Sequence, residues 1–158
     1  MICSGSARFS KSWSSTDAIP VRPLPCWKGV SEAVSDFKPQ FLHCRIRVRD
    51  LERSVRFYTE VFGFRELRRS ISPAGNQLCF LELPDNPTKL ELCYSPDFGD
   101  FDFPEDIFHF AFSVPDLDEF RRKWEPEGIE FWPSDGPVNG AFYFIDDPDG
   151  YEIEVMKV

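Results

Sequence analysis

Apolar and polar residues alternate over positions 41–48, and this period of two predicts a β-strand with His43 on one of its faces. Over positions 51–62 the apolar residues instead recur every three or four positions, which is the spacing of a helix. Asp50 is placed to cap the start of this helix, and Gly63 is placed to end it. The sequence therefore predicts a strand that leads directly into an amphipathic helix.

The same order of elements is predicted twice along the chain. In the first copy, strands are predicted to follow the helix at 64–69, 77–82 and 89–94. In the second copy, a strand at 108–114 and a helix at 117–124 are followed by strands at 129–132, 141–146 and 151–156. We therefore predict an α+β fold of two tandem βαβββ modules, at about 41–95 and 107–158, that form a curved mixed sheet.

Each copy opens on one of the two histidines of the chain, His43 and His109. In both copies Val follows five residues after the histidine, Asp seven residues after it and Leu eight residues after it. Because successive strand residues point to opposite faces, both histidines are predicted to lie on the face away from the helices. The same rule places Glu91 and Glu154, which belong to the last predicted strand of each module, on that face as well.

These two imidazoles and two carboxylates are donors that suit a divalent metal such as Zn²⁺, Ni²⁺, Co²⁺, Mn²⁺ or Fe²⁺. A strand histidine is also often a hydrogen-bonded structural residue, and a strand glutamate is often simply solvated. The placement of both histidines in register, with one inward-facing Glu in each module, favours the metal interpretation.

Charge is unevenly distributed along the chain. Residues 1–40 carry five Lys or Arg and three Asp or Glu, a net charge of +2, whereas residues 41–158 carry thirteen and twenty-four, a net charge of −11. Nucleic acid is therefore not expected as a partner, because binding to phosphates depends on clustered basic charge. No apolar run approaches the roughly 20 residues of a membrane span. The five cysteines include no C-x-x-C pair and are interpreted as reduced thiols of an intracellular protein.

The first sixteen residues contain six Ser, two basic residues and no acidic residue. This composition is similar to that of an organellar transit peptide, and it also fits a disordered tail. We expect residues 1–40 to be an extension of the domain at 41–158. The expected location is the cytoplasm, or a plastid or mitochondrion if the extension is a targeting segment.

Four stretches of the chain resemble the vicinal oxygen chelate superfamily and, in detail, the glyoxalase I (lactoylglutathione lyase) family. They are FLHCRIRVRDLERSVRFYTEVFGF at 41–64, KLELCY at 89–94, FHFAFSVPDL at 108–117 and DDPDGYEIEV at 146–155. The resemblance implies the fold of the glyoxalase, bleomycin-resistance and dioxygenase proteins. It also implies one metal ion, held by His43, Glu91, His109 and Glu154.

The reaction implied by the resemblance is the isomerisation of the methylglyoxal–glutathione hemithioacetal to S-lactoylglutathione. Glu154 is then the expected base that moves the proton, with Glu91 on the other side of the substrate. His rather than Gln at position 43, and the short connection between the modules, resemble members that prefer Ni²⁺ or Co²⁺ to Zn²⁺. The resemblance further implies a homodimer, in which His43 and Glu91 of one subunit meet His109 and Glu154 of the other.

The residues that the resemblance assigns to the thiol are only partly present. Arg47, four residues after the first ligand, resembles the family's contact to a glutathione carboxylate. Ser95 stands where the family has Asn, and Asn139 stands where the family has Lys in a G-P-x-K-G pattern. We therefore expect glutathione or another thiol as co-substrate, with Arg47 and Asn139 as substrate-binding residues. The acidic loop at 97–106 would repel an anionic tripeptide if it closed over the site, but an ordinary solvated connection is the simpler interpretation.

Two other kinds of function stay open from the sequence. One is another metal-dependent enzyme of the superfamily, a thiol transferase or a dioxygenase, although these use two His and one Glu as ligands. The other is a metal-free small-molecule binding protein similar to the bleomycin-resistance proteins, whose acidic groove would hold a cationic drug. The complete set of four candidate ligands favours the glyoxalase I interpretation over both.

Overall fold

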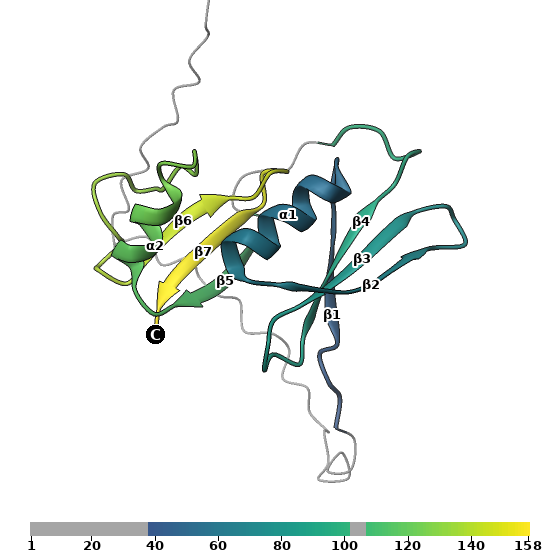
Figure 1. The fold of residues 1–158 in the computed structure, drawn as a ribbon, viewed down its shortest axis with the longest axis horizontal. Coiled ribbons are helices and arrows are strands. Elements are labelled where there is room, and N and C mark those ends of the chain that lie inside the picture. Colours follow the sequence, from purple (N-terminus) through teal and green to yellow (C-terminus); the bar gives the residue numbers. More distant parts are fainter. Residues whose placement is uncertain (1–37, 102–106) are drawn as a thin grey trace, which may run out of the picture. The chain divides into compact units, whose positions relative to one another are not determined.

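The computed structural model of the chain describes residues 38–101 and 107–158 (Figure 1). The described part of the first module contains β1 (His43–Arg47), α1 (Leu51–Phe62), β2 (Arg65–Ile71), β3 (Gln77–Glu82) and β4 (Lys89–Tyr94). The described part of the second module contains β5 (His109–Val114), α2 (Leu117–Trp124), β6 (Phe142–Asp146) and β7 (Glu152–Lys157). Residues 1–37 of the predicted extension lie outside the described residues.

Both helices begin at the repeated aspartate of the sequence. The side chain of Asp50 accepts a hydrogen bond from the backbone N–H of Arg53 at 3.0 Å, and that of Asp116 accepts one from Glu119 at 2.8 Å. Gly63 ends α1 in the left-handed conformation, with φ of 74°, which a residue with a Cβ adopts only with strain. Among the described residues, neither helix is long and apolar enough to cross a membrane.

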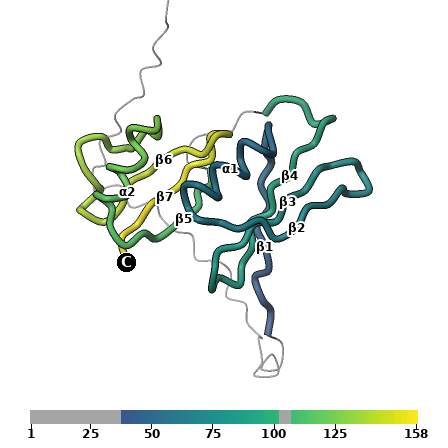
Figure 2. The backbone as a smooth tube through the Cα atoms, in the orientation of Figure 1, coloured from purple at the N-terminus to yellow at the C-terminus, as the bar shows by residue number. Residues whose placement is uncertain are grey.

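The strands form two sheets, one for each module, as the path of the chain in Figure 2 shows. The strand order is β1-β4-β3-β2 in the first sheet and β5-β7-β6 in the second. In each sheet the first and last strands of the module run parallel, and the other pairs are antiparallel. The predicted glyoxalase-like α+β fold is confirmed. Its topology places the strands that carry the candidate ligands next to one another.

The strand predicted at 129–132 does not form. Trp132 alone forms a bridge to Phe144, through backbone hydrogen bonds of 3.0 and 2.8 Å. Pro133 follows and has no N–H with which to extend the ladder. The second described sheet therefore has three strands where the first has four, and the second module lacks one strand of the predicted βαβββ order.

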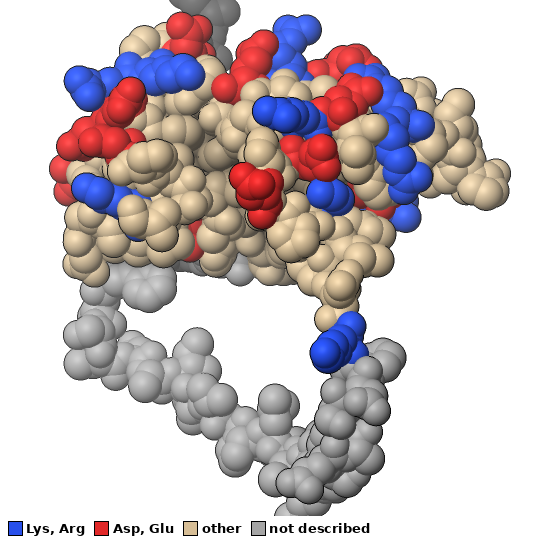
Figure 3. Space-filling model, turned by 60° about the horizontal axis from the view of Figure 1, so that its bottom comes forward, with Lys and Arg blue, Asp and Glu red and all other residues tan. Residues whose placement is uncertain are grey.

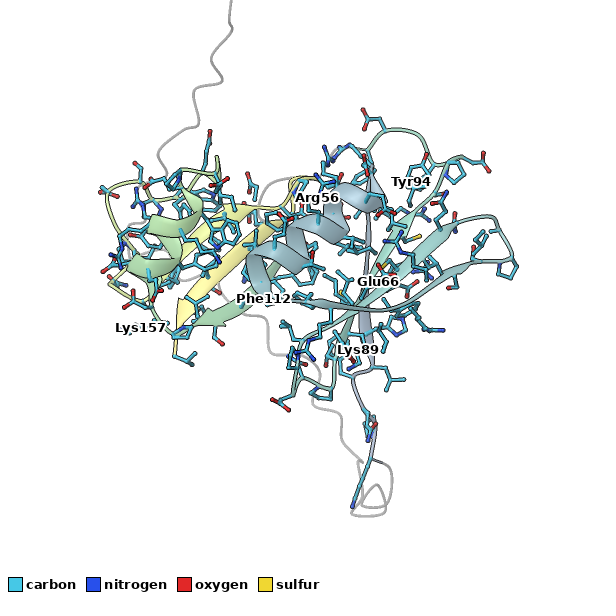
Figure 4. The ribbon with its side chains drawn as sticks, in the orientation of Figure 1. Arg56, Glu66, Lys89, Tyr94, Phe112 and Lys157 are labelled. Atoms are coloured by element: carbon cyan, nitrogen blue, oxygen red, sulfur yellow. The ribbon has the colours of Figure 1, made fainter. Side chains whose placement is uncertain are left out.

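The apolar faces of the two modules share one core. Leu92 of β4 and Ile153 and Val155 of β7 are fully buried in it, as the predicted alternation requires. At the end of α1, the ring of Phe62 packs against that of Phe112 on β5, with centroids 4.6 Å apart. Figure 4 labels Phe112 beside this helix. The first module thus packs through its helix against a strand of the second.

A buried polar network also joins α1 to the turn between β6 and β7. The hydroxyl of Tyr58, which is fully buried, donates to Asp147 at 2.9 Å. Ser54 donates to Asp149 at 2.9 Å, and the guanidinium of Arg53 lies 2.9 Å from the same carboxylate. Burial raises the pKa of Asp147 to about 6, and the hydrogen bonds that this carboxylate accepts offset only part of the effect. The turn therefore does more than reverse the chain, because its aspartates hold the two modules together.

Candidate metal centre

The first half of the candidate centre lies where β1 and β4 run side by side. His43 Nε2 is 3.1 Å from Glu91 Oε2. Arg45, which the strand register places beside Glu91, donates from Nε to the other carboxylate oxygen, Oε1, at 3.1 Å. Both oxygens are thus held by side chains of this module, and Glu91 is only 2% exposed.

Phe80 of β3 belongs to the same cluster. It pairs with Glu91 across the two strands, and its ring meets the His43 ring edge-on with centroids 5.7 Å apart. The guanidinium of Arg68 lies 4.0 Å from the centroid of the Phe80 ring. We call His43, Arg45, Phe80 and Glu91 the first half-site. Edge contact with Phe80 limits how far the imidazole can turn.

A second half-site, formed by His109, Phe144 and Glu154, repeats this geometry on β5, β6 and β7. His109 Nε2 is 3.6 Å from Glu154 Oε2. Phe144 pairs with Glu154 across the strands and meets the His109 ring edge-on at 5.9 Å. The indole of Trp132 stacks on Phe144 with ring centroids 4.4 Å apart. The repeat in the sequence is therefore also a repeat of geometry, with His, Phe and Glu in equivalent places.

The second half-site has no counterpart of Arg45. The residue paired with Glu154 on the parallel strand is Ala111, at the place that Arg45 takes opposite Glu91. The Glu154 side chain is 17% exposed, compared with 3% for Glu91. The two carboxylates thus differ in what holds them.

The fold of one chain does not close a four-ligand centre. Within residues 38–101 and 107–158, no group of three or more His, Cys, Asp or Glu lies close enough to hold a metal ion. Each half-site offers one imidazole nitrogen and one carboxylate oxygen facing each other, and Zn²⁺, Ni²⁺ and Co²⁺ accept both donors. The residues present fit such an ion in kind, and a centre with four protein ligands needs both half-sites.

Arg47 of β1 lines a pocket of about 230 Å³ together with Ser95 and Phe98. Its guanidinium is 4.2 Å from the centroid of the Phe98 ring, and its Nη1 is buried without a hydrogen-bond partner. A buried donor without a partner costs free energy, which an oxygen atom of a ligand would offset. This pocket therefore fits the predicted role of Arg47.

Arg49 neutralises part of the acidic loop that follows β4. Its Nε binds Asp100 at 2.7 Å, and its Nη1 donates to the backbone carbonyl of Asp149 at 2.9 Å. The hydrogen bond from Arg49 lowers the pKa of Asp100. Residues 102–106 of the predicted acidic loop lie outside the described residues. Figure 3 shows acidic and basic side chains interspersed over one face of the domain.

Asn139 lies in a turn of the second module, with φ of 50° and its side chain exposed. A backbone hydrogen bond of 3.1 Å from Gly140 to Pro137 closes this turn. None of the hydrogen bonds in the described part of the chain joins Asn139 to Arg47. The two predicted substrate-binding residues thus belong to different modules of the chain.

Comparison with known proteins agrees with this fold. Residues 40–155 match the sequence profile of the Glyoxalase/Bleomycin resistance protein/Dioxygenase superfamily. The chain belongs to this superfamily. It is 34% identical over 124 residues to the lactoylglutathione lyase of Haemophilus influenzae, an alignment that covers 75% of the chain and 92% of that protein. The superfamily resemblance predicted from the four sequence stretches is thus confirmed.

Two further members of the superfamily show how the chain relates to longer and solved relatives. A lactoylglutathione lyase of Arabidopsis thaliana is 34% identical over 124 residues, but the chain spans only 44% of that protein. The structure of the trypanothione-dependent glyoxalase I of Leishmania major is similar, with a TM-score of 0.67 and 32% identity, over 76% of this chain and 87% of that one. The relatives are lyases, and one of them is more than twice as long as the matched region.

Three residues of the half-sites were not among the predicted site residues: Arg45, Phe80 and Phe144. Arg45 carried a signal, because the period of two places it on the same strand face as His43. Phe80 and Phe144 carried none by themselves, since strand register alone places them opposite Glu91 and Glu154.

Proposed function

We propose that the chain is a metal-dependent enzyme of the lactoylglutathione lyase type, which isomerises the hemithioacetal of methylglyoxal and glutathione to S-lactoylglutathione. The observation that carries the proposal is the pair of equivalent half-sites, each with a histidine and a glutamate on adjacent parallel strands. The identity to the Haemophilus influenzae lactoylglutathione lyase supports the reaction.

The metal ion would be held by His43, Glu91, His109 and Glu154. Ni²⁺ or Co²⁺ is the favoured ion and Zn²⁺ also suits these donors, because the preferences of such ligand sets overlap. When bound, the ion stabilises the negative charge that develops on the substrate oxygens, an effect worth several kcal/mol.

A proton is moved between the two carbons by a carboxylate of the chain. Glu154 takes the proton from C1 of the hemithioacetal and returns it to C2, and Glu91 lies on the other side of the substrate. The 17% exposure of the Glu154 side chain supports this role, because a base must reach the substrate.

The active enzyme is a homodimer with two centres. Each half-site supplies one imidazole and one carboxylate, so the first half-site of one copy and the second half-site of the other complete a centre. The open faces of the two sheets then cover each other and exclude water from the reaction.

Arg47 binds a carboxylate of the thiol in the pocket that also contains Ser95. The buried, unpartnered Nη1 of Arg47 supports this role. Asn139 is assigned to the same half of the substrate, from the other subunit. Glutathione is the first candidate thiol, and another thiol is the alternative, since Ser95 and Asn139 differ from the family pattern. Location in the cytoplasm or in an organelle stays a prediction.

The test is reconstitution of the metal-free protein with Ni²⁺, Co²⁺ or Zn²⁺ in turn, followed by addition of methylglyoxal and glutathione. Thioester formation should appear with at least one metal, and the mass in solution should be that of a dimer holding two ions. Absence of turnover with every metal would refute the proposal. Stoichiometric metal without turnover would favour a thiol transferase or dioxygenase, and absence of metal would favour a metal-free binding protein.

A pair of variants separates the proposed ligand from its neighbour in the same motif. Glu154→Gln should abolish most thioester formation. Glu152→Gln, on the same face of β7 and paired with His109 across the strands, should lose much less of it, because Glu152 is not a proposed ligand. Equal losses in both variants would argue against Glu154 as the reacting carboxylate.

A further inference from the structure

The two carboxylates of the candidate centre are held by different numbers of protein groups. Glu91 Oε1 accepts a hydrogen bond from Arg45 Nε at 3.1 Å, and Glu91 Oε2 lies 3.1 Å from His43 Nε2. Glu154 faces His109 at 3.6 Å, and Ala111 takes the place of the arginine. A guanidinium that donates to a carboxylate restrains its position and occupies its lone pairs. Glu91 is therefore fixed, and Glu154 retains freedom to move.

This difference bears on the stereochemistry of the substrate. Addition of a thiol to an aldehyde makes C1 a new stereocentre, so the spontaneous hemithioacetal is a mixture of two C1 epimers. If the enzyme holds the sulfur and both oxygens of the substrate in the same positions, the C1 hydrogen points to one side of the bound substrate in one epimer and to the opposite side in the other. A base on each side is needed to consume both epimers, whereas one mobile base can consume only one.

We propose that Arg45 is a positioning residue that immobilises Glu91 and thereby restricts the enzyme to one C1 epimer, the one whose C1 hydrogen faces Glu154. The inference rests on the proposed function and adds to it a determinant of substrate stereochemistry. In the productive epimer, Glu154 accepts the C1 proton, and the electron pair of the C–H bond forms the enediolate. The same carboxylic acid then protonates C2, and the proton of the C1 hydroxyl passes to the C2 oxygen, which gives the thioester and the C2 hydroxyl, so no other reactant is consumed.

The experiment is a single-mixing progress curve on the preformed hemithioacetal. Enzyme is added at a concentration that converts its substrate faster than the hemithioacetal dissociates. The unmodified protein should convert about half of the hemithioacetal in a fast phase, and the rest at a rate independent of enzyme concentration, because the second epimer must first dissociate. Arg45→Met should raise the fast phase to nearly all of the hemithioacetal. In Arg45→Lys the fast phase should again convert only about half of the hemithioacetal, since an ammonium group also donates to Glu91.

The matched control is Arg68→Met, which removes a guanidinium that contacts the Phe80 ring rather than Glu91 and should leave the fast phase at about half. A second readout needs no turnover: in a crystal structure of metal-free Arg45→Met, the Glu91 carboxylate should leave its original rotamer. Conversion of both epimers by the unmodified protein, or an unchanged fast phase or Glu91 rotamer in Arg45→Met, would overturn the inference. Absence of any conversion would instead refute the proposed function on which it depends.

Discussion

The two half-sites contain the same types of residue in equivalent positions, but their carboxylates are restrained to different degrees. In each, a histidine from the first strand of a module faces a glutamate from the last strand, and a phenylalanine lies edge-on to the imidazole. In the first half-site, Arg45 donates a hydrogen bond to the buried Glu91. In the second half-site, Ala111 takes the position of Arg45 and cannot donate to Glu154. The repeat thus preserves the donor types, and a single position decides whether a carboxylate is fixed or mobile.

The junction between the modules shows a second asymmetry. The turn between β6 and β7 places Asp147 and Asp149 against α1 of the first module. The corresponding turn between β3 and β4 contains Asp85, which has φ of 63° and is exposed. One of the two equivalent turns therefore joins the modules, whereas Thr88 in the other donates to the backbone carbonyl of Phe41 at 3.0 Å, within the first module.

The different roles of the two carboxylates, Glu154 as the mobile base and Glu91 as a fixed ligand, are tested most strongly by comparing Glu154→Gln with Glu91→Gln. We expect Glu154→Gln to lower kcat about 1000-fold, the range of general base catalysis, because a neutral amide cannot accept the proton. Glu91→Gln should lower kcat about 10-fold, because an amide oxygen can replace a static ligand. Steady-state kinetics with measured metal content checks both values. Equal losses would show that the half-sites act alike despite Arg45.

The equivalence of the histidines is tested by His43→Ala and His109→Ala. Each substitution removes one imidazole donor, so each should weaken metal binding at least about 100-fold, the upper range for the loss of a supporting residue. Competition with a chromophoric chelator measures the affinity. If only one of the two variants lost affinity, the metal would bind to one half-site and the paired centre would be wrong.

The junction is tested by the pH dependence of Asp147→Asn. The folded pKa of Asp147, about 6, lies above its ordinary value of 3.8. Its contribution to stability is therefore fully present below pH 3.8 and falls as the pH rises through 6. Relative to Asp147→Asn, the unmodified protein should lose at most about 3 kcal/mol of unfolding free energy between pH 3.5 and pH 7. Urea unfolding at both pH values measures this, and a constant difference would contradict the buried neutral acid.

The smallest expected effect is that of Tyr58→Phe, which removes the hydrogen bond to Asp147. Loss of one bond to a buried carboxylate should cost about 1–2 kcal/mol of unfolding free energy. Tyr143→Phe is the matched control within the second module, where the hydroxyl meets the partly exposed Arg121 at 3.3 Å, and should cost less. Chemical unfolding compares the two variants. A larger loss in Tyr143→Phe would show that the junction contributes little to stability.

The sequence by itself determined the modules, the caps and the faces of the strands. These depend on local periodicity, so His43, Glu91, His109 and Glu154 could be assigned to the faces away from the helices before any strand was paired. Periodicity could not exclude the strand predicted at 129–132. A strand forms only where its backbone N–H and C=O groups pair with those of a neighbouring strand, and here only Trp132 finds such a partner.

Only the tertiary structure decided which side chains touch. Strand order and register place Arg45 beside Glu91 and Ala111 beside Glu154, and they place a phenylalanine opposite each glutamate. The same is true of Asp147, whose burial against Tyr58 joins residues 89 positions apart. Periodicity gives the direction of a side chain from its own strand, whereas its partner depends on long-range packing that no local pattern encodes.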